Sequence, residues 1–416
     1  MNKRIAVIGS GISGLTAAYY LSRKHQVHVF ESDNRLGGHT HTVMVESAGG
    51  PIPVDTGFIV HNDRTYPNFC RLIAELGVET QPSDMSFAVT EPGGSFEYSS
   101  RGLGGFFAQK RNCLSKPHYT LLREILRFNR EAPKLLSNPD AEAMTLGEFL
   151  DAGSYSPIFV DRYLIPMAGA VWSMAPEVMP MFPVLTLVRF MRNHGMLGIN
   201  THPKWKTIRG GSHSYFAPLT ARFRERIAKN TAIASIERSD PGVTLQFRDR
   251  PSLQFDEVVF ACHGDQILPL LGQPTDAERK VLSCFTTTRN ETCLHTDSRL
   301  LPRRAAARAS WNYLLGDSGR VTVTYHMNRL QSLNTAEDYC VTLNANGAID
   351  PARALRRMVY EHPLYTRAAI RAQSEWREIS GRNHTHFCGA YWFYGFHEDG
   401  VRSAMRVAET LGVGCS

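Results

Sequence analysis

Near its start the chain reads Ile5-Ala6-Val7-Ile8-Gly9-Ser10-Gly11-Ile12-Ser13-Gly14. The apolar run at residues 5–8 is typical of a parallel strand that is buried on both faces. The glycines have the spacing GxGxxG, in which the first permits a tight turn, the second lets a pyrophosphate approach the backbone, and the third lets a helix pack on the strand. Residues 15–22 are apolar with several small side chains and predict that helix. The stretch therefore predicts a βα unit whose helix N-terminus faces an anionic ligand.

The next motif indicates which dinucleotide the chain binds. A second predicted strand, residues 27–30, ends at Glu31, which follows Gly14 by 17 positions. A carboxylate at this place binds a ribose diol and disfavours a 2′-phosphate. Glu31, Arg35, Gly37 and Gly38 then form the pattern E-x3-R-x-G-G. This pattern resembles the second half of the FAD fingerprint in glutathione-reductase-type flavoproteins, specifically the amine oxidase and phytoene desaturase branch, and it implies FAD as the cofactor.

Other stretches at both ends of the chain resemble the same branch. They are residues 54–58, the glycine pair 210–211, and residues 231–236, 258–261, 389–390 and 395–404. In this branch the last stretch is a turn that feeds a helix whose N-terminus points at the flavin. The glycine spacing and the resemblance together assign these cofactor contacts: Gly9, Gly11, Ser13, Gly14, Glu31, Ser32, Arg35, Gly37, Gly38, His39, Thr56, Gly57, Phe58, Ile233, Ala261, Gly389, Ala390, Tyr394, Gly395, Phe396, Gly400 and Val401.

The chain departs from the family pattern near its C-terminus. Ala390 stands where many relatives have an acidic residue that contacts the ribityl chain, so that contact must come from elsewhere. The linker from Gly389 to Gly395 is also short, which predicts that residues 391–394 lie close to the flavin ring.

The fold class predicted is α/β, a Rossmann-type FAD-binding domain with an inserted mixed α+β substrate domain. Residues 1–75, 205–275 and 385–416 are assigned to the first domain, and residues 76–204 and 276–384 to the second. Within them we predict strands at 232–237, 243–247, 257–261 and 320–326, and helices at 119–136, 183–193, 351–361 and 401–411.

The candidate catalytic residues are His397, Tyr391, Tyr313 and Tyr325. Flavin chemistry requires mainly that the substrate C–H lie over the ring in a pocket poor in water, so aromatic residues are candidates for its lining. His397 is either a proton shuttle or the cap of its turn. His39, His41 and His61 could each approach the flavin, and a covalent histidyl link stays open. Histidines and acidic residues are too dispersed to predict a metal site.

Composition limits the partners. The 46 basic and 39 acidic residues leave a net charge of +7, which suits an anionic ligand or an anionic membrane surface. No motif of nucleic-acid recognition accompanies this charge. The eight cysteines form no CxxC pair, and no signal peptide or spanning segment is recognised, which predicts a reduced cytoplasmic protein, with peripheral contact at the inner membrane face as an extension. The oligomeric state is not predicted.

One stretch of the inserted segment indicates the substrate class. Residues 163–174 are apolar and rich in methionine, which suits a long flexible apolar ligand. Basic residues surround this stretch and suit an anionic head group or a bilayer: Arg123, Arg127, Arg130, Arg189, Arg192 and Lys204. An ordinary core with a solvated basic face is the alternative.

Residues 311–313, 325–331 and 395–400 resemble a bacterial subgroup of amine-oxidase-like flavoproteins associated with modification of phospholipid fatty acids, including desaturation towards furan fatty acids. The resemblance implies hydride transfer from a saturated or methyl-branched acyl chain to flavin N5, loss of a neighbouring proton, and reoxidation by O2. A flavin amine oxidase, a carotenoid or prenyl desaturase or isomerase, and a non-catalytic FAD-stabilised partner in a lipid-modifying complex are the alternatives.

Overall fold

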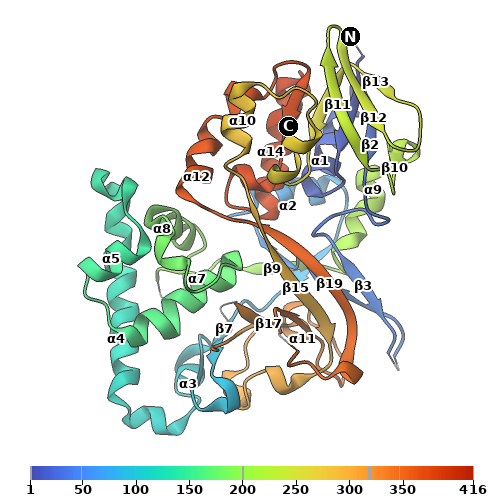
Figure 1. Ribbon diagram of the computed structural model, residues 1–416. Helices are drawn as coiled ribbons and strands as arrows, with labels where there is room; N and C mark the ends of the chain where they lie inside the picture. Colours follow the sequence, from blue (N-terminus) through green and yellow to red (C-terminus); the bar gives the residue numbers. More distant parts are fainter. Residues whose placement is uncertain (1, 48, 199–200, 317–320, 346, 416) are drawn as a thin grey trace.

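The computed structural model describes residues 2–47, 49–198, 201–316, 321–345 and 347–415. The chain forms two sheet-based domains, which Figure 1 shows one above the other with the two termini in the upper one. We call the upper one the parallel-sheet domain and the lower one the mixed-sheet domain. The predicted α/β class with a Rossmann-type domain and a mixed second domain is confirmed.

The parallel-sheet domain is built on five parallel strands collected from distant parts of the chain. Their order is β10 (Ile227–Ala228), β2 (Gln26–Phe30), β1 (Arg4–Ile8), β14 (Glu257–Phe260) and β20 (Thr385–Phe387). Helix α1 (Ile12–Leu21) is buried along its whole length because it lies between this sheet and helix α14 (His397–Thr410). The core of the domain therefore joins the first and last segments of the chain.

Smaller elements complete this domain. An antiparallel sheet contains β11 (Ile233–Ser239), β12 (Gly242–Phe247) and β13 (Leu253–Phe255), so the first two predicted strands of this region form a separate hairpin outside the parallel sheet. Two further small sheets pair β3 (Thr42–Val45) with β4 (Ile52–Asp55), and β9 (Trp205–Ile208) with β5 (Val60–Asn62) and β6 (Thr80–Pro82). The remaining helices are α2 (Pro67–Glu75), α9 (Phe216–Thr220), α10 (Asp276–Leu282), α12 (Arg367–Ser374) and α13 (Trp376–Ile379).

The mixed-sheet domain is built on seven strands. Their order is β19 (Ala354–Pro363), β15 (Thr287–His295), β18 (Cys340–Leu343), β17 (Thr322–His326), β16 (Trp311–Leu314), β7 (Phe87–Thr90) and β8 (Glu97–Ser99). Of the predicted strand at 320–326, Arg320 lies outside the described residues. The long strands β15 and β19 pair over most of their length and run from one domain into the other (Figure 1).

The helix predicted at residues 351–361 is wrong. These residues form a short helical turn and then strand β19, which pairs with β15 from Thr287↔Pro363 to His295↔Ala354. Ala, Leu, Arg and Met favour a helix locally, but the backbone hydrogen bonds of a long partner strand outweigh that preference. The strand is at the edge of its sheet, and charged side chains are typical of such edges.

A helical layer covers one half of the mixed sheet. It contains α3 (Gly102–Phe106), α4 (Lys116–Glu131), α5 (Leu146–Ala152), α6 (Pro157–Phe159), α7 (Ile165–Trp172) and α8 (Val184–Asn193), and a short helix, α11 (Met327–Leu330), follows β17. The apolar sides of these helices pack on β7, β16 and β17. The other half of the same sheet packs instead on β3 and β4 of the parallel-sheet domain. A single sheet face thus looks onto both the helical layer and the first domain.

Candidate FAD and substrate site

The glycine loop is held by contacts that leave no room for side chains at two of its positions. Gly9 has a φ of +101°, and a Cβ at Gly14 would lie 2.0 Å from the carbonyl oxygen of Gly9. Gly11 differs, because no atom lies within 4 Å of the point that its Cβ would occupy. The loop is therefore closed on the side of the sheet and open at Gly11, where a phosphate would approach the backbone.

The second glycine pair lies against the first loop. The Gly37 N–H donates to the Ser10 carbonyl at 3.0 Å, and a Cβ at Gly38 would lie 3.4 Å from the Cα of Gly11. Glu31 accepts hydrogen bonds from the Ser10 N–H at 2.9 Å and from its hydroxyl at 2.6 Å, which places the carboxylate at the same edge. The two predicted glycine motifs and the acidic residue therefore meet at the carboxyl ends of β1 and β2.

These residues fit FAD. Helix α1 has ten residues and no side chain that caps its N-terminus, so the N–H groups of its first turn are free to bind a pyrophosphate. The Glu31 carboxylate lies where a ribose diol would be bound. His39 follows the glycine pair, and its Nε2 is buried without a hydrogen-bond partner, as expected of a group that faces a ligand.

The head of α14 is fixed by three consecutive side chains. The imidazole Nε2 of His397 lies 3.0 Å from the Thr40 hydroxyl and 3.1 Å from the Tyr215 hydroxyl. Glu398 accepts hydrogen bonds from the Asn68 and Phe69 N–H groups at the start of α2. Asp399 accepts one from the Phe396 N–H at 2.9 Å and so caps its own helix. The helix begins at His397, four residues earlier than predicted.

Gly400 lies inside α14 rather than before it. A Cβ at this position would meet the Ile12 side chain at 2.7 Å and the Ser13 hydroxyl at 2.9 Å. The first turns of α1 and α14 therefore touch. This contact brings the two predicted parts of the cofactor site, Ile12 and Gly400, to one place although 388 positions separate them.

Asp55 ties three segments together. Its carboxylate accepts hydrogen bonds from the Thr42 hydroxyl, from the Ser212 N–H at 2.9 Å and from the Gln331 amide at 3.1 Å. Burial raises the pKa of Asp55 to about 6, and hydrogen bonds from Thr42 and Ser212 oppose that rise. The carboxylate links β4, the turn after Gly211 and the mixed-sheet domain directly beside the predicted Thr56–Phe58 segment.

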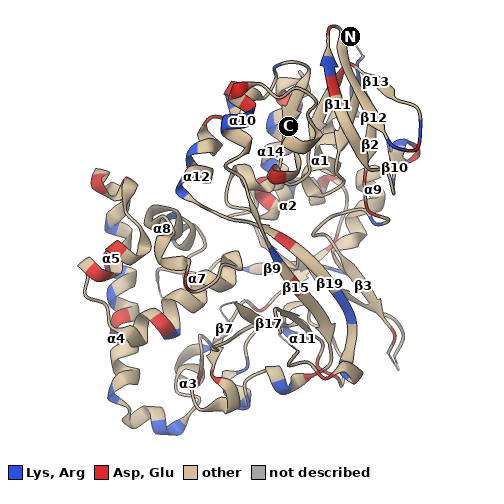
Figure 2. Cartoon of the chain, viewed as in Figure 1, with Lys and Arg blue, Asp and Glu red and all other residues tan. Residues whose placement is uncertain are grey.

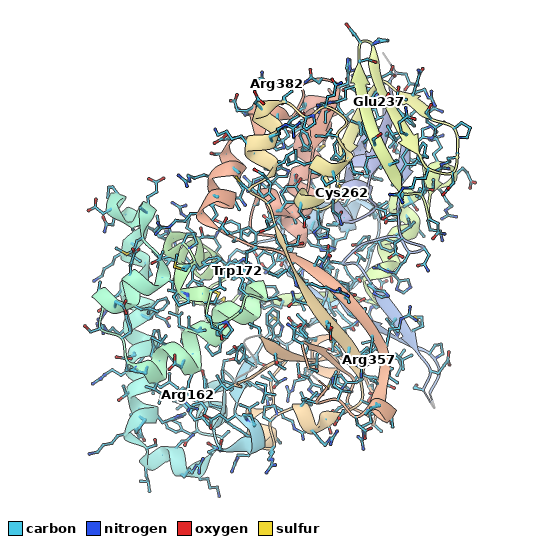
Figure 3. The ribbon with its side chains drawn as sticks, viewed as in Figure 1. Arg162, Trp172, Glu237, Cys262, Arg357 and Arg382 are labelled. Atoms are coloured by element: carbon cyan, nitrogen blue, oxygen red, sulfur yellow. The ribbon has the colours of Figure 1, made fainter. Side chains whose placement is uncertain are left out.

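Several partly accessible side chains lie deep in the protein where the two domains meet. Burial lowers the pKa of His39 and of His263, lowers that of His362 to about 4, and raises that of Cys262 to about 12. All four nevertheless keep accessible surface. The ring centroid of His39 lies 5.2 Å from that of His362 and 6.0 Å from that of His263, so side chains of both domains meet here. Figure 3 shows Cys262 on the side of the parallel-sheet domain that faces the other domain.

One face of the mixed sheet lies against these side chains. Side chains alternate between the faces of a strand, so Trp311 and Tyr313 share a face with Tyr325, which is paired with Trp311. The register continues this face to Tyr360 and His362 on β19. The Tyr360 ring stacks on His39 with centroids 5.0 Å apart, and its hydroxyl lies 2.7 Å from that of Thr56. The face that carries the predicted tyrosines therefore looks onto the cofactor segments.

The predicted catalytic residues lie in different surroundings. Tyr325 is partly buried between the core of the helical layer and the core that packs on β3 and β4, and burial raises its pKa. Tyr313 is almost fully buried in the helical layer's core, and burial raises its pKa to about 12. Tyr391 packs on Phe285, and its hydroxyl has no partner. His397 stacks on Phe58 with centroids 3.6 Å apart, and burial lowers its pKa to about 3. All four are therefore neutral at pH 7.

The other predicted contacts surround the same region. The Arg35 guanidinium donates to the carbonyls of Leu36 and Thr40 and so supports the loop. Gly57 lies against the His39 carbonyl, Ala261 against Gly9 and Gly14, and the Gly389 N–H donates to the Ser403 hydroxyl. Val401 is buried, whereas other predicted contacts keep accessible surface, among them Ser32, Ile233, Ala390, Tyr394, Gly395 and Phe396.

Sequence reasoning missed the residues that hold the site in place. Tyr215 and Gln331 act through long-range hydrogen bonds, for which no local pattern exists, whereas Asp55 lies in the recognised segment 54–58 and only its partners were missed. Tyr360 was hidden by the helix predicted at residues 351–361, and His362 follows that helix directly. Their two-residue spacing in Met358-Val359-Tyr360-Glu361-His362 is the one signal that favours a strand face. No cluster of metal-binding side chains occurs among the residues that the structure describes.

The fold and this site define an FAD-dependent oxidoreductase. The family model of flavin-containing amine oxidoreductases matches residues 12–333. The chain belongs to this family.

Individual relatives share either a short segment or the fold. Protoporphyrinogen oxidase 2 of Arabidopsis thaliana is 58% identical over 43 residues, which are 10% of this chain and 8% of that protein. A triple mutant of putrescine oxidase has a TM-score of 0.72 at 14% identity and covers 99% of this chain and 98% of its own. A fatty acid isomerase from P. acnes has a TM-score of 0.68 at 15% identity and covers 97% of both chains. The matches to whole structures show the shared fold.

Alanine at Gly11 and at Gly14 should have different effects. Gly14→Ala places a methyl group 2.0 Å from the Gly9 carbonyl oxygen, so the protein should be destabilised by about 3 kcal/mol or more. Gly11→Ala finds open space, so the apoprotein should melt as the wild type does, measured by circular dichroism. Its methyl group would stand in the path of the pyrophosphate, so fluorescence titration should show FAD affinity at least tenfold lower. Unchanged FAD affinity in Gly11→Ala would place the pyrophosphate elsewhere.

Asp399 should make stability depend on pH. Burial raises its pKa from 3.8 to about 7, so between these values the folded protein keeps a proton that the unfolded chain has lost. The resulting stability is complete below about pH 4 and is lost as pH rises through 7. Asp399→Asn stays neutral and still caps the helix. Its unfolding free energy minus that of the wild type should rise by about 4 kcal/mol from pH 4 to pH 8, at about 1.4 kcal/mol per pKa unit.

The matched control for this experiment is Asp63→Asn. Lys206 lies 2.8 Å from the Asp63 carboxylate and holds the pKa of that carboxyl below its usual value. Asp63 therefore stabilises the protein above its ordinary pKa, and its variant should show a small difference of the opposite sign in the same urea titrations. A flat difference for Asp399→Asn across this range would contradict the buried neutral carboxyl.

Proposed function

We propose that this FAD-dependent oxidoreductase desaturates a long apolar substrate, such as a saturated or methyl-branched acyl chain of a phospholipid. The substrate loses a hydride and the proton of the neighbouring carbon, and a carbon–carbon double bond forms between them. Bound FAD supplies the two-electron acceptor, and O2 takes up the electrons and becomes hydrogen peroxide. The protein's own part is to hold the chain, exclude water and present no competing charge.

The observation that carries this proposal is an apolar lining: Tyr163, Met167, Trp311 and Tyr325 pack against one core and keep accessible surface, and we infer that they border the substrate cavity. Burial alone raises the pKa of Tyr163, to about 12, and of Tyr325, and no ionised group contributes to either shift. Both side chains keep accessible surface. A ligand beside them would therefore meet aromatic and aliphatic groups without a counter-charge, which favours a neutral apolar ligand.

The charged substrates of related enzymes fit this cavity poorly. The carboxylate of an amino acid or the second ammonium of a diamine would be desolvated there with no partner, at a cost of several kcal/mol. Lys206 on β9 forms an ion pair with Asp63 at 2.8 Å near the surface, so it adds no charge beside the substrate. These facts support an acyl chain over an amine.

The helical layer offers a surface that a flexible chain can follow. Its core contains Met174, Met179 and Met191, with Met167 partly buried beside them. Methionine side chains adapt to irregular apolar shapes. Phe190 of this layer stacks on Phe396 at the head of α14, with centroids 5.1 Å apart, so the layer reaches the predicted flavin motif. The fatty acid isomerase with the same fold supports the view that such a cavity can hold an acyl chain.

Anaerobic stopped-flow absorbance tests this function. A phospholipid with methyl-branched acyl chains, dispersed in detergent, should bleach the flavin band near 450 nm in the purified holoprotein. Putrescine, L-amino acids and a carotenoid should leave the band unchanged over the same time. Bleaching by an amine or a carotenoid, with none by acyl lipids, would overturn the proposal, and bleaching by none of them would favour the non-catalytic alternative.

Two variants of Tyr325 test the uncharged cavity. Tyr325→Glu places a carboxyl group beside the substrate and should slow bleaching by the acyl lipid at least a hundredfold. Tyr325→Phe keeps the ring and should stay within about threefold of the wild type, because a protonated hydroxyl cannot act as a base. Flavin absorbance and melting temperature check that both variants are folded. A hundredfold loss in Tyr325→Phe would instead assign a proton-transfer role to the hydroxyl.

A further inference from the structure

Helix α4 and the segment that leads into it form a surface with an unusual share of exposed apolar side chains. Leu114 is 91% exposed and Leu103 is 72% exposed, while Tyr119 and Leu126 are 50% and 46% exposed. Large apolar side chains this accessible mark a contact with something else when they gather together. Tyr119 links them, because its ring lies 5.6 Å from that of Phe107, which follows Leu103 by one helical turn. We call residues 101–130 the α3–α4 surface.

The same surface is strongly basic. Residues 101–130 contain seven basic residues and one acidic residue, Glu124, and Glu131 at the end of α4 pairs with Arg127 and Arg130, so the surface keeps a clear excess of positive charge. Glu124 is buried and accepts hydrogen bonds from the Ser156 N–H and hydroxyl, so it does not neutralise the exterior. Figure 2 shows Lys and Arg along α4 and on the chain below it. The exposed cations are Arg101, Lys110, Arg111, Lys116, Arg123 and Arg130.

Basic and apolar groups alternate along one exposed stripe of α4. Tyr119, Arg123, Leu126 and Arg130 are separated by four, three and four residues, which places them on one side of the helix. The opposite side buries Leu121 and Phe128 in the domain core. A shallow groove of about 590 Å³ follows the exposed stripe. The side of α4 that packs on the protein is therefore apolar, and the side that faces solvent carries both apolar and basic residues.

We propose that the α3–α4 surface docks on an anionic phospholipid bilayer. Leucine and tyrosine side chains would enter the boundary between head groups and acyl chains, and the lysines and arginines would bind the negative head groups around them. A nucleic acid would neutralise the cations but leave Leu103 and Leu114 in water. No helix among the described residues is both long and apolar enough to span a bilayer, so the contact is peripheral.

Docking does not depend on the proposed reaction. Binding to vesicles requires no oxidation of their lipids, and desaturation of a detergent-dispersed lipid requires no vesicle. The two proposals therefore fail separately.

Co-sedimentation of the FAD-loaded protein with vesicles tests the docking. At 0.1 M salt the protein should sediment with vesicles that contain one quarter phosphatidylglycerol in phosphatidylcholine, and should stay in solution with pure phosphatidylcholine. Raising the salt to 0.5 M should weaken the binding at least fivefold, since the attraction is screened. Leu114→Ser/Leu126→Ser and Lys116→Glu/Arg123→Glu should each lower the partition coefficient at least tenfold.

Matched variants elsewhere on the molecule serve as controls. Met44→Ser removes a 51% exposed apolar side chain from β3, and Arg224→Glu/Lys229→Glu reverses two exposed charges in the parallel-sheet domain. Both controls should bind vesicles as the wild type does, and all variants should keep their melting temperature and flavin absorbance. Three results would each disprove the docking surface. These are a wild type that does not bind phosphatidylglycerol vesicles, surface variants that bind them as the wild type does, and control variants that lose binding to the same extent.

Discussion

The architecture depends on a close contact between two helix ends. The first turn of α1 can approach β1 only because Gly14 has no side chain where the Gly9 carbonyl passes, and α14 can approach α1 only because Gly400 has none where Ile12 and Ser13 lie. These approaches bring the N-terminal loop and the C-terminal helix to one edge of the parallel sheet. Both helices then present their N-terminal ends to the region where a dinucleotide binds at the carboxyl ends of the strands. Glu31, His39 and the cavity residues are arranged around that edge.

The local motifs were predictable because each is a short pattern with one physical meaning. The glycine spacing, the acidic residue at the end of β2 and the second glycine pair all depend on backbone geometry within a few residues. The strand β19 was not predictable in this way, since its residues favour a helix until β15 pairs with them. The hydrogen bonds that hold the site in place could not be predicted from the sequence either. Asp55 and His397 both lie in recognised segments, but their partners here are more than 150 residues away, which no local pattern reveals.

Function follows from the distribution of charge as much as from the cofactor. The side chains proposed to border the substrate cavity, Tyr163 and Tyr325 among them, are aromatic or apolar, whereas the α3–α4 surface contains seven basic residues. The proposed lipid enzyme would use this division, with an apolar interior for the reacting carbons and a cationic exterior for the head groups. The family supplies the cofactor chemistry, and the charge distribution supports the choice of substrate.

The most direct test is a crystal structure of the protein with FAD and a long-chain alkyl ligand. The account predicts that the pyrophosphate lies at the N-terminus of α1 beside Gly11, that the flavin ring reaches the head of α14, and that the alkyl chain lies along Tyr163 and Tyr325. A flavin ring that points away from this cavity, or an acidic or basic side chain that reaches the ligand's chain there, would contradict it.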